Sequence, residues 1–324
     1  MTKRSNLTLT LALVAFVTAA ASASAGSGDY RDEIRKYRAS REAELKADDG
    51  WLTVAGLFWL RPGTNVAGSA AGSGILLPKK APARVGVFEL KDGRVTFTPD
   101  PNARVMSMGK ALASAAAAAP TEDRTALAVG DLRMFVIRRE DRFGVRMRDL
   151  KSTMRRDYKG VRFYPVRSVF RVRAKFFPYD TSRTIAIPNV LGQAPAMESP
   201  GFVTFTLNGK AFRLDPVYET DERKDLFFIF KDTTSRDATY PAGRFLHTDL
   251  PRNGVVIVDF NKAYNPPCAF TDFATCPLPP KQNELPVRIE AGELAYHGYR
   301  DQLANLKRVM QEPGNLSAEP SRTQ

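Results

Sequence analysis

Apolar and polar residues alternate in many short runs along the chain. In one such run, the apolar Phe143, Val145 and Met147 alternate with Arg146 and Arg148. A period of two residues places successive side chains on opposite faces of a strand, so this pattern predicts half-buried β-strands. Strands are expected at 85–90, 95–98, 132–139, 143–148, 169–176, 184–187, 202–207, 211–214, 226–230, 255–260 and 287–290.

The residues between these runs favour antiparallel pairing. Asp92-Gly93 and Asn208-Gly209 each separate two runs, a position in which Asp-Gly or Asn-Gly indicates a two-residue hairpin. The runs 226–230 and 255–259 are apolar without alternation, which is typical of central strands covered on both faces. The predicted fold class is therefore mainly β, a sandwich or a partly open barrel.

Helices are expected only near the two ends of the chain. Residues 29–49 are rich in helix formers, and Ile34, Tyr37 and Leu45 would attach this helix to the body. Residues 296–310 predict a C-terminal helix, and the polar tail 313–324 is expected to be disordered. Because neither an internal repeat nor a linker is evident, residues 26–312 are expected to form a single β-rich domain.

The first 25 residues have the layout of a secretory signal peptide. Lys3 and Arg4 precede an apolar run, and Ala23-Ser24-Ala25 supplies small residues for cleavage. Cleavage after Ala25 would place the mature protein in the periplasm or outside the cell. An uncleaved N-terminal anchor is the alternative. No later stretch approaches the length of apolar sequence that crosses a bilayer, so no transmembrane span is expected in the mature chain.

Basic residues are concentrated in one segment. The formal net charge of the 324 residues is +13, and it falls to +11 when Lys3 and Arg4 leave with the signal peptide. Segment 133–175 contains fifteen basic and four acidic residues, which also amounts to +11. In the runs 143–148 and 169–176 the basic residues occupy alternate positions, so each strand would present a cationic face to water.

A cationic sheet face would attract anions. If the two strands share a sheet, the expected partner is an anionic envelope component, such as lipid headgroups or acidic polysaccharide, or an anionic small molecule. Arg142 and Arg146 are candidate ligand-binding residues, because guanidinium groups match carboxylate and phosphate. Export makes nucleic acid a poor candidate partner. The alternative is a solvated basic face with scattered acidic partners.

Residues 259–293 have an unusual sequence, DFNKAYNPPCAFTDFATCPLPPKQNELPVRIEAGE. This segment resembles the signature of a bacterial family known as domain of unknown function 1684 (DUF1684). The resemblance extends to segments 50–63, 138–149 and 226–246 of the chain. Since the family has no assigned biochemical role, the resemblance implies neither a reaction nor a cofactor, and the cofactor stays unknown.

Polar residues follow the apolar run 255–258 and form part of a candidate binding site. Asp259, Asn261 and Asn265 lie where a strand ends, a place where scaffolds commonly display functional side chains. Asn261 and Asn265 would orient a ligand. In the alternative interpretation, these side chains satisfy backbone groups of the loop.

Three residues are candidates for proton transfer, Tyr240, His247 and Asp259. Arg244 follows Ala242-Gly243 in a predicted turn, where it would bind an anion or lie beside Asp259. The sequence contains neither a nucleophile elbow nor a dinucleotide fingerprint, so enzyme activity is left open. We therefore expect an exported protein that binds a small anionic ligand or substrate near segment 240–265. The alternative is a non-catalytic, envelope-associated module that uses the cationic 133–175 face.

Cys268 and Cys276 allow three interpretations. Two cysteines in an exported protein most simply form a disulfide. Both thiolates could instead bind a metal together with His247 or His297, but the spacing is not that of a zinc knuckle, and no metal site is predicted. A nucleophilic Cys268 activated by His247 is the third possibility.

Overall fold

The computed structural model describes residues 10–114, 116–117 and 126–296, with side chains from residue 28 onward. It confirms the mainly β prediction, with several sheets, one long N-terminal helix and, among the described residues, no closed barrel. The predicted C-terminal helix and tail lie outside the described residues, apart from Tyr296. In the described part of the chain, no helix has the length and apolar character needed to cross a membrane.

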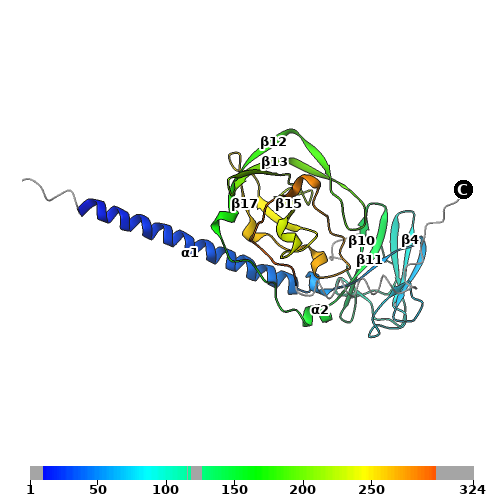
Figure 1. Ribbon diagram of the computed structural model, residues 1–324. Helices are drawn as coiled ribbons and strands as arrows, with labels where there is room; N and C mark the ends of the chain where they lie inside the picture. Colours follow the sequence, from blue (N-terminus) through cyan, green and yellow to red (C-terminus); the bar gives the residue numbers. More distant parts are fainter. Residues whose placement is uncertain (1–9, 115, 118–125, 297–324) are drawn as a thin grey trace, which may run out of the picture.

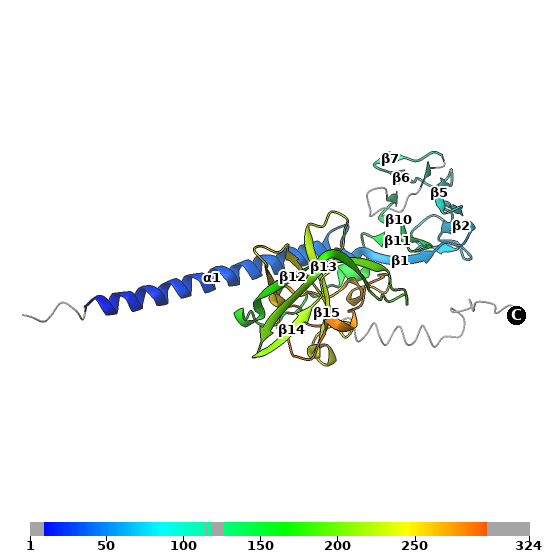
Figure 2. The same ribbon diagram turned by 90° about the horizontal axis from the view of Figure 1, so that it is seen from above.

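Helix α1 (Thr10–Lys46) contains most of the predicted helix 29–49. In Figures 1 and 2 its first part projects from the body, and its last part lies beside the C-terminal half of the chain and ends close to the start of β1. Ile34 and Leu45 are fully buried, as expected from their positions on the helix. Residues 1–9 of the predicted signal peptide lie outside the described residues, and cleavage after Ala25 stays a prediction.

The N-terminal half contains two sheets that share one apolar core, which we call the first sandwich. Phe88, Phe97, Met134 and Val145 lie in this core. The six-stranded sheet has the order β1 (Val54–Trp59), β11 (Arg142–Asp149), β10 (Leu132–Arg139), β9 (Leu127–Val129), β6 (Met106–Ser107), β7 (Lys110–Ala111). The five-stranded sheet has the order β3 (Ile75–Leu76), β2 (Gly63–Gly68), β4 (Gly86–Lys91), β5 (Arg94–Pro99), β8 (Ala116–Ala117).

The C-terminal half forms a second sandwich around another core. Val172, Phe205, Phe228 and Val258 come together there from four different strands. Its four-stranded sheet has the order β14 (Lys210–Leu214), β13 (Ala196–Leu207), β12 (Arg171–Ala186), β17 (Val255–Asp259). Its three-stranded sheet has the order β16 (Arg244–Asp249), β15 (Asp225–Asp232), β18 (Glu284–Leu285).

Short helices connect these strands. They are α2 (Thr153–Arg156) and the 3₁₀ turns η1 (Trp51–Thr53), η2 (Ser168–Phe170), η3 (Thr233–Arg236), η4 (Phe260–Lys262), η5 (Pro267–Ala269) and η6 (Lys281–Asn283). Both predicted hairpins are confirmed. Asp92 and Gly93 join β4 to β5 with φ of 49° and 70°, and Asn208 and Gly209 join β13 to β14 with φ of 51° and 74°. Two consecutive positive φ values are those of the type I′ turn.

Most predicted strands are confirmed, but three predictions are wrong. Residues 287–290 do not form a strand. Arg244 begins β16 instead of lying in a turn, and β16 pairs with β15 in antiparallel register. The prediction for β15 as a central strand is confirmed, whereas β17 lies at the edge of its sheet. Its outward-facing Ile257 is only partly covered.

Candidate functional site

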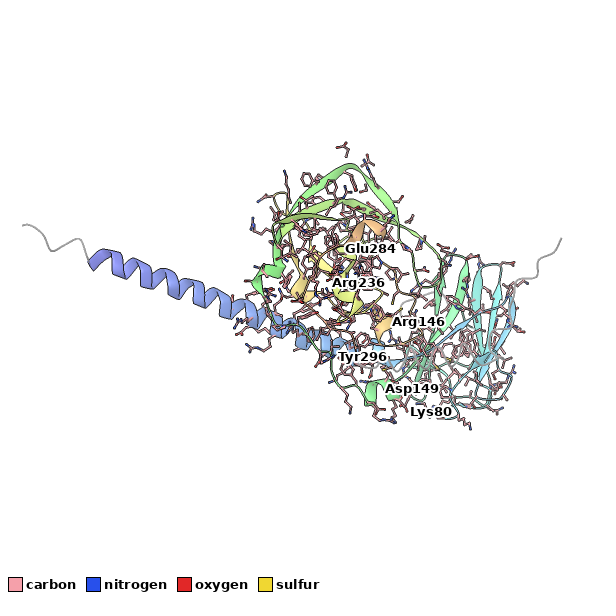
Figure 3. All side chains as sticks on the ribbon, in the orientation of Figure 1. Lys80, Arg146, Asp149, Arg236, Glu284 and Tyr296 are labelled. Atoms are coloured by element: carbon pink, nitrogen blue, oxygen red, sulfur yellow. The ribbon has the colours of Figure 1, made fainter. Side chains whose placement is uncertain are left out.

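The two predicted cationic strands do not share a sheet, because β11 belongs to the first sandwich and β12 to the second. The wet face predicted for β11 is wrong. Arg146 is 5% exposed, lies over the ring of Trp51 at 5.2 Å, and is seen between the two sandwiches in Figure 3. Arg148 is also buried and donates to the carbonyl of Gly50 at 2.7 Å. Arg142 is exposed and lies 4.0 Å above the ring of Trp59.

Helix α1 covers the polar residues at the end of β17 and just beyond it. The Tyr30 hydroxyl donates to the Asp259 carboxylate, 2.9 Å from both oxygens, and accepts from Asn261 Nδ2 at 2.9 Å. Asp259 is only 4% exposed. Burial, followed by the charge of Asp259, raises the pKa of Tyr30 above its ordinary value. The structure therefore brings Asp259 and Asn261 together, and their partner is a tyrosine of the same chain.

A second contact with α1 involves Asn265. Arg41 Nε donates to Glu293 Oε1 at 3.2 Å, and Arg41 Nη2 donates to the Asn265 carbonyl at 3.1 Å. The Asn265 backbone N–H donates to Glu293 Oε2 at 2.7 Å. Burial raises the pKa of the Glu293 carboxyl despite the nearby Arg41. Arg41 also lies 4.6 Å above the ring of Tyr264. These contacts hold α1 to the second sandwich.

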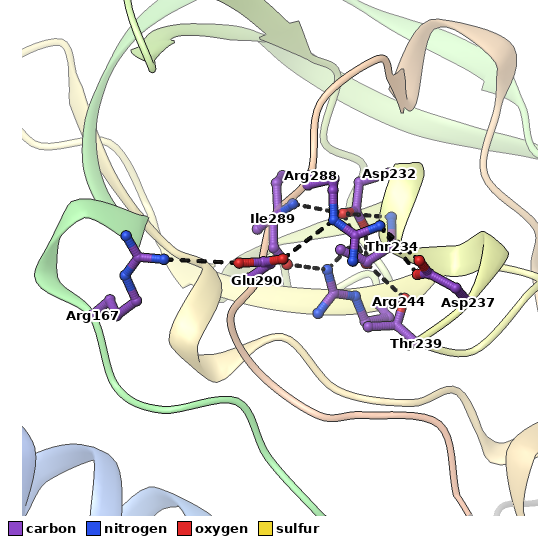
Figure 4. A network of polar contacts seen from close by, with 9 residues as sticks. All are labelled: Arg167, Asp232, Thr234, Asp237, Thr239, Arg244, Arg288, Ile289 and Glu290. Carbon is purple, nitrogen blue, oxygen red and sulfur yellow. Dashed lines mark hydrogen bonds and ion pairs between the residues drawn. The ribbon is translucent and has the colours of Figure 1, made fainter.

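Arg244 is buried inside the second sandwich and pairs with Asp232. Arg244 Nη2 lies 2.8 Å from Asp232 Oδ1, and both side chains are 1% exposed (Figure 4). The guanidinium also donates to the carbonyls of Ile289, at 3.1 Å, and Ala291. Arg244 was expected to bind an anion or to lie beside Asp259, but its carboxylate partner in the structure is Asp232. The Arg244 guanidinium thus holds the segment around residues 289–291 in place by donating to its carbonyls.

The remaining proton-transfer candidates have different surroundings. His247 Nδ1 lies 2.9 Å from Asp225 Oδ2, and Nε2 lies 3.5 Å from Glu219 Oε2. Its ring stacks on Phe227 with 4.6 Å between centroids, and its side chain is 30% exposed. Tyr240 is buried in the apolar cluster beneath α1. The sequence found His247, but not the acidic neighbours that orient it.

Cys268 and Cys276 lie together as free thiols in this structure. The Cys268 backbone N–H donates to Cys276 Sγ at 3.0 Å. Cys268 is partly exposed, and Cys276 is 4% exposed. A hydrogen bond from the Cys276 thiol lowers the pKa of Cys268, while burial raises the pKa of Cys276 well above its ordinary value. The disulfide stays a prediction. His297 lies outside the described residues.

A cationic surface does occur on β12. Val172 and Ala174 point into the core, while Arg171, Arg173 and Lys175 are exposed on the opposite side. We call this side of the β14-β13-β12-β17 sheet the outer face. Figure 1 shows β12 and β13 arching over the second sandwich, so that this face looks away from its core. The predicted alternation of 169–176 is thereby confirmed within β12.

Aromatic rings continue the outer face beyond Lys175. The rings of Phe177 and Phe202 stack with 5.0 Å between centroids, and Tyr179 lies 6.0 Å from Phe202. These residues were not among the predicted site residues. A signal was present, because Phe177 and Tyr179 continue the period of two that begins at Arg171.

Three cations rest directly on these rings. Arg213 lies 3.8 Å above Phe202, Arg183 4.4 Å above Tyr179, and Lys175 4.7 Å above Phe177. Cation–π contact holds a long basic side chain in one place while its charge stays in water. The outer face therefore carries basic side chains whose positions are fixed by contact with aromatic rings.

A hollow of about 900 Å³ lies elsewhere, on the first sandwich. It is lined by residues including Lys80, Arg104, Met106 and Arg133, and by none of the predicted site residues.

A family model and a solved structure each match a part of the chain. No curated protein matches it. The solution NMR structure of an uncharacterized protein of Haloarcula marismortui is 28% identical, with 43% of this chain and 78% of that chain covered and a TM-score of 0.37. The family described as "Protein of unknown function (DUF1684)" matches residues 156–294, which include every strand of the second sandwich. The resemblance to DUF1684 is confirmed over these residues.

Proposed function

We propose that the protein is exported, is cleaved after Ala25, and binds an anionic polysaccharide of the cell envelope on the outer face of the β14-β13-β12-β17 sheet. The observation that carries this proposal is the set of three cations held on aromatic rings. Positioned side chains lose less conformational entropy when a ligand binds, so the same charges bind more tightly than mobile ones would.

Some of the basic side chains on the outer face are paired with acidic residues, and others are not. Arg213 is paired with Asp215 at 2.8 Å, and Arg171 lies 3.8 Å from Asp259. Within the described part of the chain, neither Arg173 nor Lys175 takes part in an ion pair, and both are exposed. These two cations occupy neighbouring outward positions on β12, so they favour a ligand with charges repeated along its length.

A polymer suits this face better than a bilayer does. Membrane-binding surfaces insert apolar side chains below the headgroups. Among the described residues, the large apolar side chains most exposed to water are Leu76, Met108, Val169, Val190 and Leu250, and none is an outward residue of this sheet. The outer face instead presents Arg and Lys charges that aromatic rings hold in place, and such fixed charges suit the repeated acidic groups of a polymer.

Segment 240–265 is a weaker candidate for a ligand site. Arg244 donates to Asp232 and to two backbone carbonyls, and Asp259 accepts from Tyr30. Both groups are nearly inaccessible to water. A ligand could reach them only by displacing internal partners, which would leave buried charge uncompensated.

A binding measurement with polygalacturonate tests the proposal, with dextran as the neutral control. The variant Arg173→Glu/Lys175→Glu should bind at least about tenfold more weakly, because it reverses two adjacent charges of the outer face. The matched control is Lys91→Glu/Arg94→Glu, which changes the net charge equally at the exposed β4–β5 hairpin of the first sandwich. This control should bind within about twofold of the wild type.

Other outcomes would contradict the proposal. Equal loss in both double variants would mean attraction to net charge alone. Binding to phosphatidylglycerol vesicles or to single-stranded DNA, with none to polygalacturonate, would identify a different class of ligand. N-terminal sequencing of protein from a periplasmic fraction tests export separately, with Gly26 expected as the first residue.

A further inference from the structure

The loop that carries the two cysteines is fixed at several points. Thr271 Oγ1 donates to the carbonyl of Val54 in β1 at 3.0 Å, and Arg139 of β10 donates to Thr275 Oγ1 at 2.8 Å. The backbone N–H of Val190 donates to the carbonyl of Cys276 at 3.1 Å. The loop is thus tied to the first sandwich on one side and to the β12–β13 connection on the other.

The backbone at Cys268 is fixed by prolines and by a short helix. It lies within η5, whose first residue is Pro267, and the Ala269 backbone N–H donates to the carbonyl of Pro266 at 2.9 Å. Cys268 N–H reaches Cys276 Sγ at 3.0 Å. Backbone hydrogen bonds therefore hold the two thiols next to one another, so they can react without a change in the conformation of the loop.

The two thiols are unequal in their access to solvent. Cys268 is partly exposed, while Cys276 is buried among Ile187, Phe245 and Ala274. A molecule arriving from solvent therefore meets Cys268 first. The charged groups that act on Cys268 are Arg146 of β11, which favours the thiolate, and Asp272 of the same loop, which opposes it.

We propose that Cys268 and Cys276 form a thiol–disulfide exchange site, in which Cys268 reacts with an incoming disulfide and Cys276 resolves the intermediate. Exchange proceeds through a mixed disulfide and requires an accessible attacking thiolate with a second thiol close by. This inference stands apart from the polysaccharide proposal, because the cysteines do not belong to the outer face.

The chemistry balances with a small disulfide, RSSR, as the oxidant. The Cys268 thiolate attacks one sulfur of RSSR, the S–S bond breaks, and one RS⁻ leaves and takes a proton from water. Cys276 then loses its proton to solvent, and its thiolate attacks Cys268 Sγ. The second RS⁻ leaves and is protonated. The protein dithiol is oxidised by two electrons, and RSSR is reduced to two RSH.

Mass spectrometry of the reduced full-length protein with glutathione disulfide tests this sequence of steps. In Cys276→Ser, one glutathione should accumulate on Cys268, because no thiol is left to resolve the adduct. In Cys268→Ser, the buried Cys276 should form an adduct at least about tenfold more slowly. The wild type should pass through a transient adduct and end as an intramolecular disulfide that dithiothreitol reduces without unfolding the protein.

Thermal denaturation of each variant shows whether it is folded, and the wild-type time course needs no substitution. Equal rates of glutathionylation in the two single variants would overturn the assignment of roles. A wild-type disulfide that dithiothreitol reduces only after denaturation would also overturn the proposal, since it would identify a static cross-link. Two wild-type thiols that stay free under excess glutathione disulfide would do the same.

Discussion

Arg244 and Asp232 form an ion pair with 2.8 Å between Nη2 and Oδ1, and each side chain is 1% exposed. Three further groups complete the pair. Thr234 donates its hydroxyl to Asp232 Oδ2 at 2.8 Å, the Ile289 backbone N–H donates to the same oxygen at 2.8 Å, and Arg244 donates to the Ile289 carbonyl at 3.1 Å. The pair thus joins β15 and β16 to the segment that follows β18.

Replacing Arg244 by Met should destabilise the protein by about 3–5 kcal/mol, because Asp232 would remain buried without its counter-charge. Urea denaturation measures the loss. Arg244→Lys keeps the charge but not the forked donors, so it should lie between Met and the wild type. The control is Lys151→Met, which breaks an exposed pair with Asp131 and should cost less than about 1 kcal/mol. Similar losses in both Met variants would refute the assigned role.

The contact between Tyr30 and Asp259 should stabilise the docking of α1. Tyr30→Phe removes the hydroxyl that donates to a buried carboxylate, and the expected loss is about 1–3 kcal/mol. Asp259→Asn should cost a similar amount, and the double variant should lose less than the sum because both changes remove one interaction. Unfolding free energies in urea give the coupling. Additive losses would show that the two residues act independently.

The contact between Tyr30 and Asp259 also shows what the sequence could not provide. The two residues are separated by 229 positions, and no local pattern links them. The sequence correctly marked Asp259 and Asn261 as polar residues that follow an apolar strand. It could not indicate that a helix from the other end of the chain covers them.

Alternating patterns predicted strands well, but they did not predict exposure. The runs 143–148 and 169–176 have the same alternation of apolar and basic residues. On β12 the basic residues are exposed, whereas on β11 the segments near Trp51 and Cys268 cover Arg146. Burial of an arginine depends on what packs over the strand, and this is set by distant parts of the chain.

Strand β16 was missed for a related reason. Phe245 and Leu246 are adjacent and both buried, because the two faces of β16 contact different apolar clusters. A strand covered on both faces shows no alternation. The charged residue at its start and the Pro-Ala-Gly before it are typical of a turn, and the compensating Asp232 lies twelve positions away.

Two glycines with positive φ should respond differently to alanine. Gly209, with φ of 74° in the β13–β14 turn, has open space where a Cβ would lie, so Gly209→Ala should cost about 1 kcal/mol. Gly243 has φ of 103°, and a Cβ there would lie 2.6 Å from the Phe230 carbonyl oxygen and 2.6 Å from Pro279 Cγ. Gly243→Ala should therefore cost roughly 2–5 kcal/mol.

The comparison isolates the contacts around Gly243, because alanine restricts the unfolded chain equally at both positions. Urea denaturation of the two variants gives the difference directly. If Gly243→Ala were no more destabilising than Gly209→Ala, then the approach of Pro279 to this turn would not occur in solution.

The pH dependence of Cys268 alkylation should reveal its hydrogen bond to Cys276. Because that bond lowers the pKa of Cys268, the thiolate persists to lower pH than in an ordinary cysteine, and alkylation by iodoacetamide should rise at a correspondingly lower pH. Cys276→Ala removes the donor, so its profile should move to higher pH. Cys276→Ser keeps a hydroxyl donor and should move less. The rates are measured on folded, reduced protein, and identical profiles for the Ala and Ser variants would show that the hydrogen bond does not control the pKa.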